Sequence, residues 1–305
     1  GFKNPDLSID TKITVLMTFY SVKDLYQDQK AQALDLARIL VDVHPDDPKS
    51  HSIYGDLLSQ DKKYDSARVE FMKAVSLDSS KYVIWEELLR LDLEAEDMKL
   101  LGEHSQKVIE LFPEQPLPYL FSGLANYQLK DFNAAVNSLN QGAKLVVDNS
   151  ELLSQFYMYL GDSYHALNNQ AESDKNYQKS LDLKGDNAYV LNNFAYYLSI
   201  RNEDLPKAET MAKKAVTLDP ENGSFQDTYG WVLYKLGKYE EARIWIAKAL
   251  EEKDGPSAEV MEHYGDVLFK LGNTDQAIEF WQKAKTKGDG SKFLDKKIAE
   301  KKLIE

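Results

Sequence analysis

Residues 228–242 read TYGWVLYKLGKYEEA, and residues 263–277 read HYGDVLFKLGNTDQA. The aromatic, glycine and apolar positions of the two stretches coincide, so that Gly265 follows Gly230 by 35 residues. Apolar residues recur at the i, i+3, i+4 and i+7 spacing of an amphipathic helix, interrupted by a short polar turn. Short helix pairs repeated at such a period are typical of a solenoid, because each pair buries its apolar faces only by stacking on its neighbours.

The repeat extends toward the N-terminus through small or helix-packing positions. The positions equivalent to Gly230, spaced 34–38 residues apart, are Ser21, Gly55, Leu89, Gly123, Gly161 and Ala195. Small residues also follow most of them at matching distances, as Ala242 and Ala249 follow Gly230. Glycine inside a helix costs roughly 0.5–1 kcal/mol relative to alanine, so we interpret these positions as places where helix backbones approach closely.

This pattern resembles the tetratricopeptide repeat over nearly the whole chain. The characteristic Leu-Gly pair occurs as Leu160 and Gly161, and tyrosine replaces the leucine before Gly230. The resemblance implies an all-α fold, a right-handed α-α superhelix of eight helix-turn-helix repeats within residues 10–287. Residues 1–9 would then be the N-terminal tail of a longer chain.

The third repeat, residues 82–113, departs most from the pattern. Leu89 and Leu101 stand there where small residues are expected. A bulky side chain between two helices holds their backbones apart. The two helices of this degenerate repeat should therefore pack more loosely or in a shifted position.

Two further irregularities predict local structure. The spacing grows to 38 residues between Gly123 and Gly161, which predicts a lengthened second helix or a longer loop around residues 145–151. Repeat six contains an inserted residue in RNEDLPKAE, where Pro206 suits the first turn of the second helix.

Residues 288–305 are predicted to form a linker and a capping helix. The stretch SKFLDKKIAEKKLIE (291–305) is amphipathic, with apolar residues among its lysines at Phe293, Leu294, Ile298 and Leu303. A solenoid needs such a cap, because its last repeat would otherwise expose an apolar face. A basic recognition helix is the alternative interpretation.

Composition excludes several classes of function. The 305 residues carry 37 Lys and Arg against 50 Asp and Glu, a formal charge of −13, which argues against nucleic acid or an anionic membrane surface as the main partner. The absence of cysteine excludes disulfides, zinc-thiolate sites and thiol catalysis. No apolar run approaches the ~20 residues of a membrane span.

Titratable residues show no catalytic pattern. The five histidines are scattered over different repeats, and no HExxH motif is present. We interpret Glu262 as a surface carboxylate beside a core-facing His263, and GDGSK (288–292) as a linker because it lacks the spacing of a phosphate-binding loop. We therefore expect no enzyme activity, no metal and no cofactor.

The resemblance implies that the first helix of each repeat lines a concave groove. Helical geometry places Gln226, Tyr229 and Leu233 with Gly230 against the second helix of their own repeat, and puts a neighbouring stripe toward the groove. The residues predicted to contact a partner there are Tyr189, Asn192, Tyr196, Asp227, Trp231, Tyr234, Asp266 and Phe269. Aromatic rings with carboxylates suit a peptide that has apolar anchors and some Lys or Arg. Alternatively, Tyr196 and Trp231 fill the seam between successive first helices.

Repeat four carries an apolar version of the same stripe. Its residues are Leu117, Leu120, Leu124 and Tyr127. Four exposed apolar residues would form a patch that anchors a partner helix or strand. Alternatively, they pack inside a tightly curved superhelix or compensate for the irregular third repeat.

Some relatives bind the C-terminal tails of chaperones, and the sequence can be searched for the residues that do so. Relatives that grip chaperone C-terminal tails use Lys and Asn on one first helix, Asn on the next, and Lys and Arg on the third. Asn193 matches the middle position, but Met158 and Asp162 replace the first pair, and Ser224 and Thr228 the last. The cationic clamp is missing, so an acidic chaperone tail is not the expected ligand.

Residues 190–285 are similar to bacterial tetratricopeptide repeat proteins, many of them exported or lipid-anchored. The chain begins GFKNPD without methionine, so we expect a segment of a longer protein whose export signal lies upstream. The function indicated is a noncatalytic scaffold or adaptor that binds a protein or peptide in its concave groove, in the periplasm or at the outer membrane. The alternative is a structural module whose repeats stack on the missing N-terminal region or on another copy.

Overall fold

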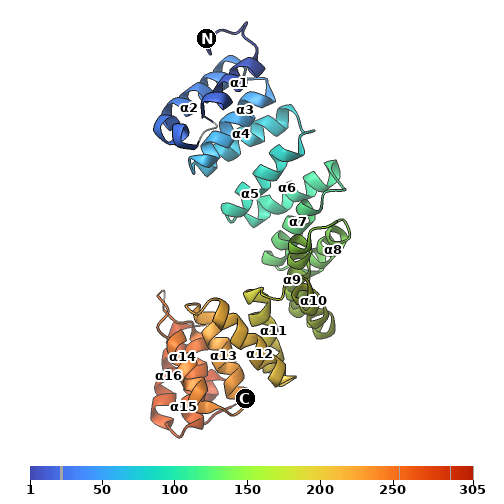
Figure 1. Ribbon diagram of the computed structural model, residues 1–305. Coiled ribbons are helices and arrows are strands. Elements are labelled where there is room, and N and C mark those ends of the chain that lie inside the picture. Colours follow the sequence, from blue (N-terminus) through green and yellow to red (C-terminus); the bar gives the residue numbers. More distant parts are fainter. Residues whose placement is uncertain (21–22, 254, 289, 305) are drawn as a thin grey trace. The chain divides into compact units, whose positions relative to one another are not determined.

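The computed structural model describes residues 1–20, 23–253, 255–288 and 290–304, which form helices and no strand (Figure 1). The first helices of the eight repeats are α1 (Ile9–Tyr20), α3 (Pro48–Gln60), α5 (Tyr82–Glu94), α7 (Pro116–Gln128), α9 (Ser150–Ala166), α11 (Ala188–Arg201), α13 (Gly223–Lys235) and α15 (Ala258–Lys270). The second helices are α2 (Lys23–Val43), α4 (Tyr64–Leu77), α6 (Met98–Leu111), α8 (Phe132–Ala143), α10 (Gln170–Leu183), α12 (Leu205–Leu218), α14 (Tyr239–Ala249) and α16 (Thr274–Lys287). A short helix, α17 (Leu294–Glu300), follows them. The predicted all-α fold with eight helix pairs and a terminal helix is confirmed.

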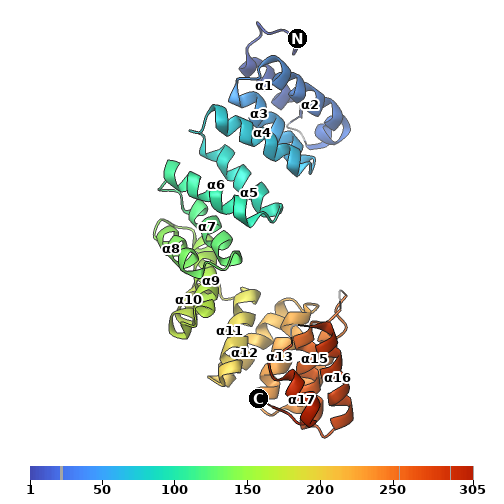
Figure 2. The ribbon, with the colours of Figure 1, turned by 180° about the vertical axis from the view of Figure 1, so that it is seen from behind.

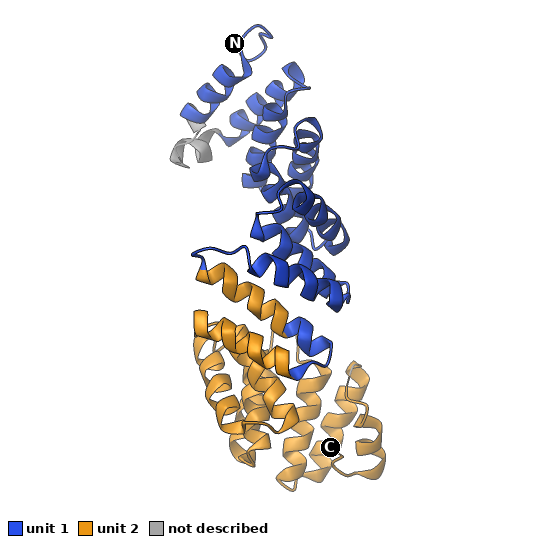
Figure 3. Ribbon diagram, turned by 90° about the vertical axis from the view of Figure 1, so that its right-hand side faces the viewer, with its two compact units in different colours: residues 1–149, 162–170 blue, residues 150–161, 171–305 orange. Residues whose placement is uncertain are grey.

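The chain divides into two compact units (Figure 3). Unit 1 contains residues 1–149 and 162–170, and unit 2 contains residues 150–161 and 171–305. In each unit, first helices pack against their own second helices and against neighbouring pairs. Among the described residues, each unit has a large and a smaller cluster of buried apolar side chains, the large one around Phe71 and Leu101 in unit 1 and around Phe194 and Val232 in unit 2.

Side chains in the turns between repeats cap the N-termini of several first helices. Asp47 accepts a hydrogen bond from the Lys49 N–H at 2.9 Å, and Asn222 accepts one from the Phe225 N–H at 3.2 Å. Ser257 caps α15 in the same manner. Each cap satisfies an N–H that the helix itself leaves unbonded, which stabilises the helix by about 1 kcal/mol.

The turn inside each of repeats two to eight contains a residue with positive φ. The glycine of the KLG motif supplies it in the last two repeats, with φ of 77° at Gly237 and 84° at Gly272. Repeats two to six use side-chain-bearing residues instead, namely Lys62, Glu96, Lys130, Asn168 and Asn202. Glycine adopts this left-handed conformation without the steric cost that other residues incur.

The glycines predicted to lie at close approaches do so. A Cβ at any of them would lie within 3.0 Å of a large side chain on the second helix of the same repeat. The pairs are Gly55 with Phe71, Gly123 with Leu139, Gly161 with Tyr177, Gly230 with Ile246 and Gly265 with Trp281. Ser21, the equivalent position in repeat one, lies outside the described residues.

In the third repeat the large residue is on the first helix and the small residue is on the second helix. Leu89 takes the place of the glycine, and Ser105 stands where the second helix of the other repeats carries its large side chain. Both residues are fully buried. The helices α5 and α6 also approach each other less closely than those of neighbouring repeats, as predicted from Leu89 and Leu101.

The same exchange of sizes can be tested in repeat four. We expect Gly123→Leu to lower the free energy of unfolding by about 1–3 kcal/mol, because the new side chain collides with Leu139. The double variant Gly123→Leu/Leu139→Ser should lose less free energy of unfolding than the two single variants lose together. Urea unfolding of the four proteins in a double-mutant cycle measures this coupling. Strict additivity would contradict the proposed exchange.

The other predicted irregularities are also resolved. Residues 144–149 form a longer loop, and the helix that lengthens is the first helix α9 rather than the second helix α8. Pro206 lies in the first turn of α12, as predicted. The terminal helix α17 packs on the last repeat, with Leu294 5% exposed, which confirms the cap (Figure 2).

Candidate partner-binding site

A pocket of about 370 Å³ opens on the first-helix face of unit 2. Its walls come from α11, α13 and α15 and from the segment after α16. Aromatic rings and charged groups share this surface, with Tyr196 and Trp231 near Lys235 and Glu259. The pocket therefore offers both apolar contact and ionic hydrogen bonding to a ligand.

Trp231 lines the pocket as part of an aromatic stack. Its ring lies parallel to Tyr234, with centroids 4.7 Å apart, and to His263, with centroids 3.9 Å apart. The Lys235 ammonium lies 4.8 Å from the Trp231 ring centroid, a cation–π distance. Because His263 belongs to α15, the stack joins the first helices of repeats seven and eight.

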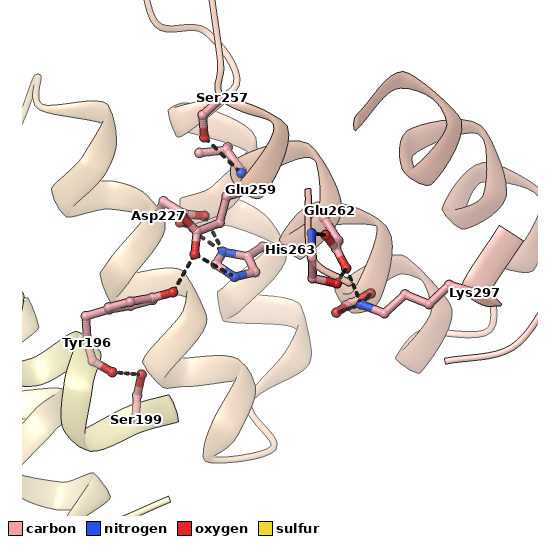
Figure 4. A network of polar contacts seen from close by, with 11 residues as sticks. Tyr196, Ser199, Asp227, Ser257, Glu259, Glu262, His263 and Lys297 are labelled. Atoms are coloured by element: carbon pink, nitrogen blue, oxygen red, sulfur yellow. Dashed lines mark hydrogen bonds and ion pairs between the residues drawn. The ribbon is translucent and has the colours of Figure 1, made fainter. Parts of the chain in front are cut away.

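His263 is held between two carboxylates (Figure 4). Its Nδ1 lies 2.9 Å from Asp227 Oδ2, and its Nε2 lies 3.9 Å from Glu259 Oε1. Burial alone would lower the pKa of His263, but the Asp227 and Glu259 carboxylates outweigh burial and raise the pKa above its usual value. A protonated imidazole stacked on Trp231 also gains cation–π attraction.

Tyr196 closes the side of the pocket formed by α11. Its hydroxyl hydrogen-bonds the Glu259 carboxylate across the pocket (Figure 4). Burial, together with the Glu259 charge, raises the pKa of Tyr196. The phenol therefore stays neutral and serves as a donor, while the Glu259 side chain remains 54% exposed at the rim.

An ion-pair cluster closes the other side. The buried Lys297 ammonium lies 2.8 Å from Glu262 Oε1 and 2.7 Å from Asp266 Oδ2. Ser291 donates to Glu262 from both its backbone N–H and its hydroxyl, and the Trp281 indole N–H donates to Asp266 at 2.8 Å. These bonds tie the C-terminal segment to α15.

The two carboxylates respond differently to this cluster. Although burial opposes ionisation, hydrogen bonds from Lys297 and Ser291 hold the pKa of Glu262 below its usual value. Burial raises the pKa of Asp266, and Lys297 offsets that rise only in part. Lys297 therefore favours the ionised form of Asp266, which burial opposes.

The interpretation of Glu262 as a surface carboxylate is wrong. Glu262 is only 4% exposed, and its carboxylate accepts hydrogen bonds from Lys297 and Ser291. Sequence reasoning also missed Lys297 as a buried residue. A signal was present: Lys297 follows Leu294 by three residues and so shares the apolar face of the terminal helix. Predicting its partners required the fold, because they lie 31 and 35 residues away.

The predicted groove residues separate by exposure. Asn192, Asp227, Trp231, Tyr234 and Asp266 are each at most 8% exposed. Tyr196 and Phe269 are half-buried, and Tyr189 is 63% exposed with its ring edge against Phe225. Three of the predicted residues line the pocket, namely Tyr196, Trp231 and Asp266. The alternative that Trp231 fills a seam between first helices fits its position.

The predicted apolar patch of repeat four lies in unit 1 and is largely covered. Leu120 and Leu124 are 4% and 9% exposed, while Leu117 and Tyr127 are half-buried. Leu117 packs against the core cluster of unit 1, and Tyr127 contacts the Phe132 ring at 5.6 Å. These contacts favour the packing interpretation.

Within the described residues, no group of three or more His, Asp or Glu side chains is arranged to hold a metal ion. In the same part of the chain, every helix is too short or too polar to cross a membrane.

Comparison with known proteins identifies the family. The tetratricopeptide repeat family matches residues 124–293, more than half of the chain, and a second match to this repeat covers residues 24–80. The chain therefore belongs to the tetratricopeptide repeat family.

Two curated proteins are similar over part of this chain. The human N-alpha-acetyltransferase 16, NatA auxiliary subunit, is 31% identical over 98 residues, which are 31% of this chain and 11% of that protein. A TPR repeat-containing protein of Pseudomonas aeruginosa is 30% identical over 84 residues, 28% of this chain and 14% of that protein. The matches thus span less than a sixth of either relative.

Solved structures share the fold at low sequence identity. The APC/C hetero-tetramer Cut9–Hcn1 has a TM-score of 0.67 and 14% identity, covering 96% of this chain and 56% of that chain. A tetratricopeptide repeat protein from Parabacteroides merdae has a TM-score of 0.61 and 13% identity, covering 83% and 98%. The pilus biogenesis factor PilW has a TM-score of 0.58 and 17% identity, covering 70% and 96%.

Proposed function

We propose that this protein is a noncatalytic interaction scaffold that binds a segment of a partner protein on the first-helix face of unit 2. The observation that carries the proposal is the pocket between α11, α13 and α15, which combines stacked aromatic rings with charged groups. Aromatic residues contribute much of the energy at protein interfaces, and their rims are polar. Membership of a repeat family whose stacked helices present extended binding surfaces supports this role.

The charges of the pocket indicate the chemistry of the partner. Glu259 is the carboxylate most open to solvent, while the other acids are engaged by His263 and Lys297. A partner segment with an apolar anchor for the Trp231–Tyr196 surface and a Lys or Arg for Glu259 would satisfy both features. Exposed charges at a binding rim mainly set specificity and the rate of association.

Charge reversal at Glu259 tests the proposal at an exposed side chain. Because it also removes the acceptor of the Tyr196 hydroxyl and a carboxylate beside His263, the melting temperature of the variant is measured as well. We expect Glu259→Lys to weaken capture of the native partner by about tenfold or more, equivalent to roughly 1.4 kcal/mol. Capture from the native source with the wild-type protein as bait, followed by calorimetry with the partner obtained, measures the change. The same protocol detects the alternative role, since repeats that stack on another copy would co-purify with this chain.

Glu279→Lys is the matched control. Glu279 lies on the second helix α16 and its side chain is 60% exposed, close to the 54% of Glu259. The two variants make the same charge change in the same unit, so Glu279→Lys should bind the partner as the wild type does. Equal affinities of both variants, whether high or low, would exclude this pocket as the binding site.

We also propose that the protein acts in the bacterial envelope. The support is a relative from Pseudomonas aeruginosa that is 30% identical over 84 residues, together with the expectation from the sequence that residues 190–285 resemble exported bacterial repeat proteins. Fractionation of the source cells tests this location, and recovery of the protein only with the cytoplasmic fraction would contradict it.

A further inference from the structure

A second groove lies in unit 1, on the face formed by the first helices α1, α3 and α5. It consists of two adjoining cavities of about 420 and 380 Å³ that share Ile53 and Asp56 of α3. Neither cavity contains a residue that the sequence had singled out for binding. The groove is therefore independent of the pocket in unit 2.

Both lobes of this groove have apolar walls. Leu16, Met17 and Leu57 line the first lobe, and Ile13, Pro48 and Ile84 line the second. Met17 is 46% exposed, so apolar surface remains open to water there. Burying it against a ligand would yield about 25 cal/mol for each Å² removed from water.

Asp56 lies at the junction of the two lobes. It follows Gly55, the close-packing position against Phe71, so its side chain projects about 100° away from the second helix of its repeat. It forms no hydrogen bond or ion pair with another residue in the described part of the chain. Burial, and to a lesser degree the nearby Glu87 charge, raises the pKa of Asp56 to about 6.

The other charged groups on this surface leave Asp56 without a counterion. Glu87 of α5 lines the first lobe, and it adds negative charge. In the second lobe Lys49 bonds to Asp10 at 2.6 Å, and Lys81 lies near Asp78. The groove thus has four carboxylates against two lysines that already have acidic neighbours.

We propose that this groove binds a peptide segment in which one basic residue is flanked by apolar residues, with the basic side chain pairing with Asp56. The apolar flanks would fill the two lobes. A Lys or Arg side chain suits the junction because its apolar stem contacts Ile53 while its charged end reaches the carboxylate. An oppositely charged ligand also removes the cost of holding an unpaired carboxylate in partly apolar surroundings. The proposal concerns a different unit and stands apart from the function proposed for the pocket of unit 2.

The probes are short acetylated, amidated, fluorescently labelled peptides with a Leu-Ile-Lys-Leu-Ile centre. A second peptide has Glu in place of Lys, and a third keeps Lys between serines. Fluorescence anisotropy with the full chain should show that the first peptide binds at least about tenfold more tightly than either of the others. Equal affinities of the Lys and Glu peptides would overturn the proposal.

Asp56→Asn tests the role of the carboxylate, since it keeps the size of the side chain and removes the charge. This variant should lose the preference for Lys over Glu. The control Asp42→Asn removes the same charge from an exposed position on the second helix α2 and should keep the preference. Preference retained in Asp56→Asn, or lost equally in both variants, would contradict the assignment.

Methyl NMR shows which groove the peptide occupies. In a protein labelled at isoleucine δ1 methyl groups, the Lys peptide should shift the signals of Ile13, Ile53 and Ile84, and leave the signal of Ile246 in unit 2 unchanged. Shifts confined to unit 2 would place the peptide in the other pocket and refute the second site. A result of this kind leaves the function proposed for unit 2 intact, and failure of that function leaves the unit 1 test intact.

The stability of Asp56→Asn gives a second, ligand-free measurement. The pKa of Asp56 rises from 3.8 to about 6 on folding, so the folded state binds more protons between these values. Stability should therefore fall as the pH rises through this window in the wild type, and Asp56→Asn should melt at the higher temperature above pH 6. A lower melting temperature in Asp56→Asn would show that the carboxylate already has a stabilising partner, and would refute the vacant site.

Discussion

Replacing Lys297 by alanine is expected to lower the free energy of unfolding of unit 2 by about 3–5 kcal/mol, because it leaves two buried carboxylates without a counterion. Glu262 and Asp266 are 4% and 2% exposed, and Lys297 is the ammonium that contacts both. The folded chain can relieve this repulsion by protonating one of the two carboxylates or by releasing the terminal helix. We therefore expect residues 291–303 to detach first.

Hydrogen exchange and thermal unfolding measure the two parts of this effect. Amides of residues 291–303 should lose protection in Lys297→Ala, and the melting temperature should fall. Lys296→Ala is the control, because the neighbouring Lys296 is 62% exposed and only approaches Glu300 at 3.9 Å. That variant should change stability by less than about 0.5 kcal/mol. Similar behaviour of both variants would show that the buried ion pairs contribute little.

A third variant separates the loss of the ion pairs from the loss of packing. The triple change Glu262→Gln, Asp266→Asn and Lys297→Met removes all three charges and keeps similar side-chain volumes. Replacement of whole buried charge clusters by neutral groups is often neutral or stabilising, so much of the stability should return. A triple variant as unstable as Lys297→Ala would show that Lys297 acts through specific hydrogen bonds.

Alanine at Trp231 should destabilise unit 2 by about 3–5 kcal/mol, the usual cost of removing a buried Trp. The ring is 8% exposed and lies between Tyr234 and His263, so its loss opens a cavity between repeats seven and eight. Because repeats gain stability from their neighbours, the loss should spread to adjacent helices. Urea unfolding followed by far-ultraviolet circular dichroism measures it.

Two further variants show which property of Trp231 accounts for the loss of stability. Trp231→Phe should cost less, because it keeps an aromatic ring in the stack and removes an indole N–H that lacks an acceptor among the described residues. Tyr189→Ala, at a 63% exposed aromatic residue, should cost less than about 1 kcal/mol. If Trp231→Ala unfolds like the wild type, the seam position of its ring is refuted, and the residue would be free to serve binding alone.

The family and the close-packing positions could be predicted from residues alone, because both depend on short-range periodicity. Gly230 and Gly265 face Ile246 and Trp281 at the same offset, so one rule applies to every repeat that carries the glycine. The third repeat shows the limit of that rule. Leu89 was recognised as a departure, whereas the compensating Ser105 was not, because pairing the two requires the register between helices.

The candidate site was predicted only in part. Trp231 and Tyr196 were placed on the groove stripe from helical geometry, and both line the pocket. Helical geometry gives the direction of a side chain but not what stands opposite it. His263 covers Trp231 from the next repeat, and that contact decides between an exposed ring and a packed one.

Sequence periodicity alone was sufficient for the repeat, for its helix pairs and for the glycines between them, since neighbours within a repeat are set by local spacing. Tertiary structure decided which charges are buried together and which remain without a partner. Lys297 meets Glu262 and Asp266 from 35 and 31 residues away, and Asp56 faces a groove with no counterion in the described part of the chain. Burial and charge pairing depend on all the elements that surround a group at once. For this reason, they appear only when the repeats are stacked.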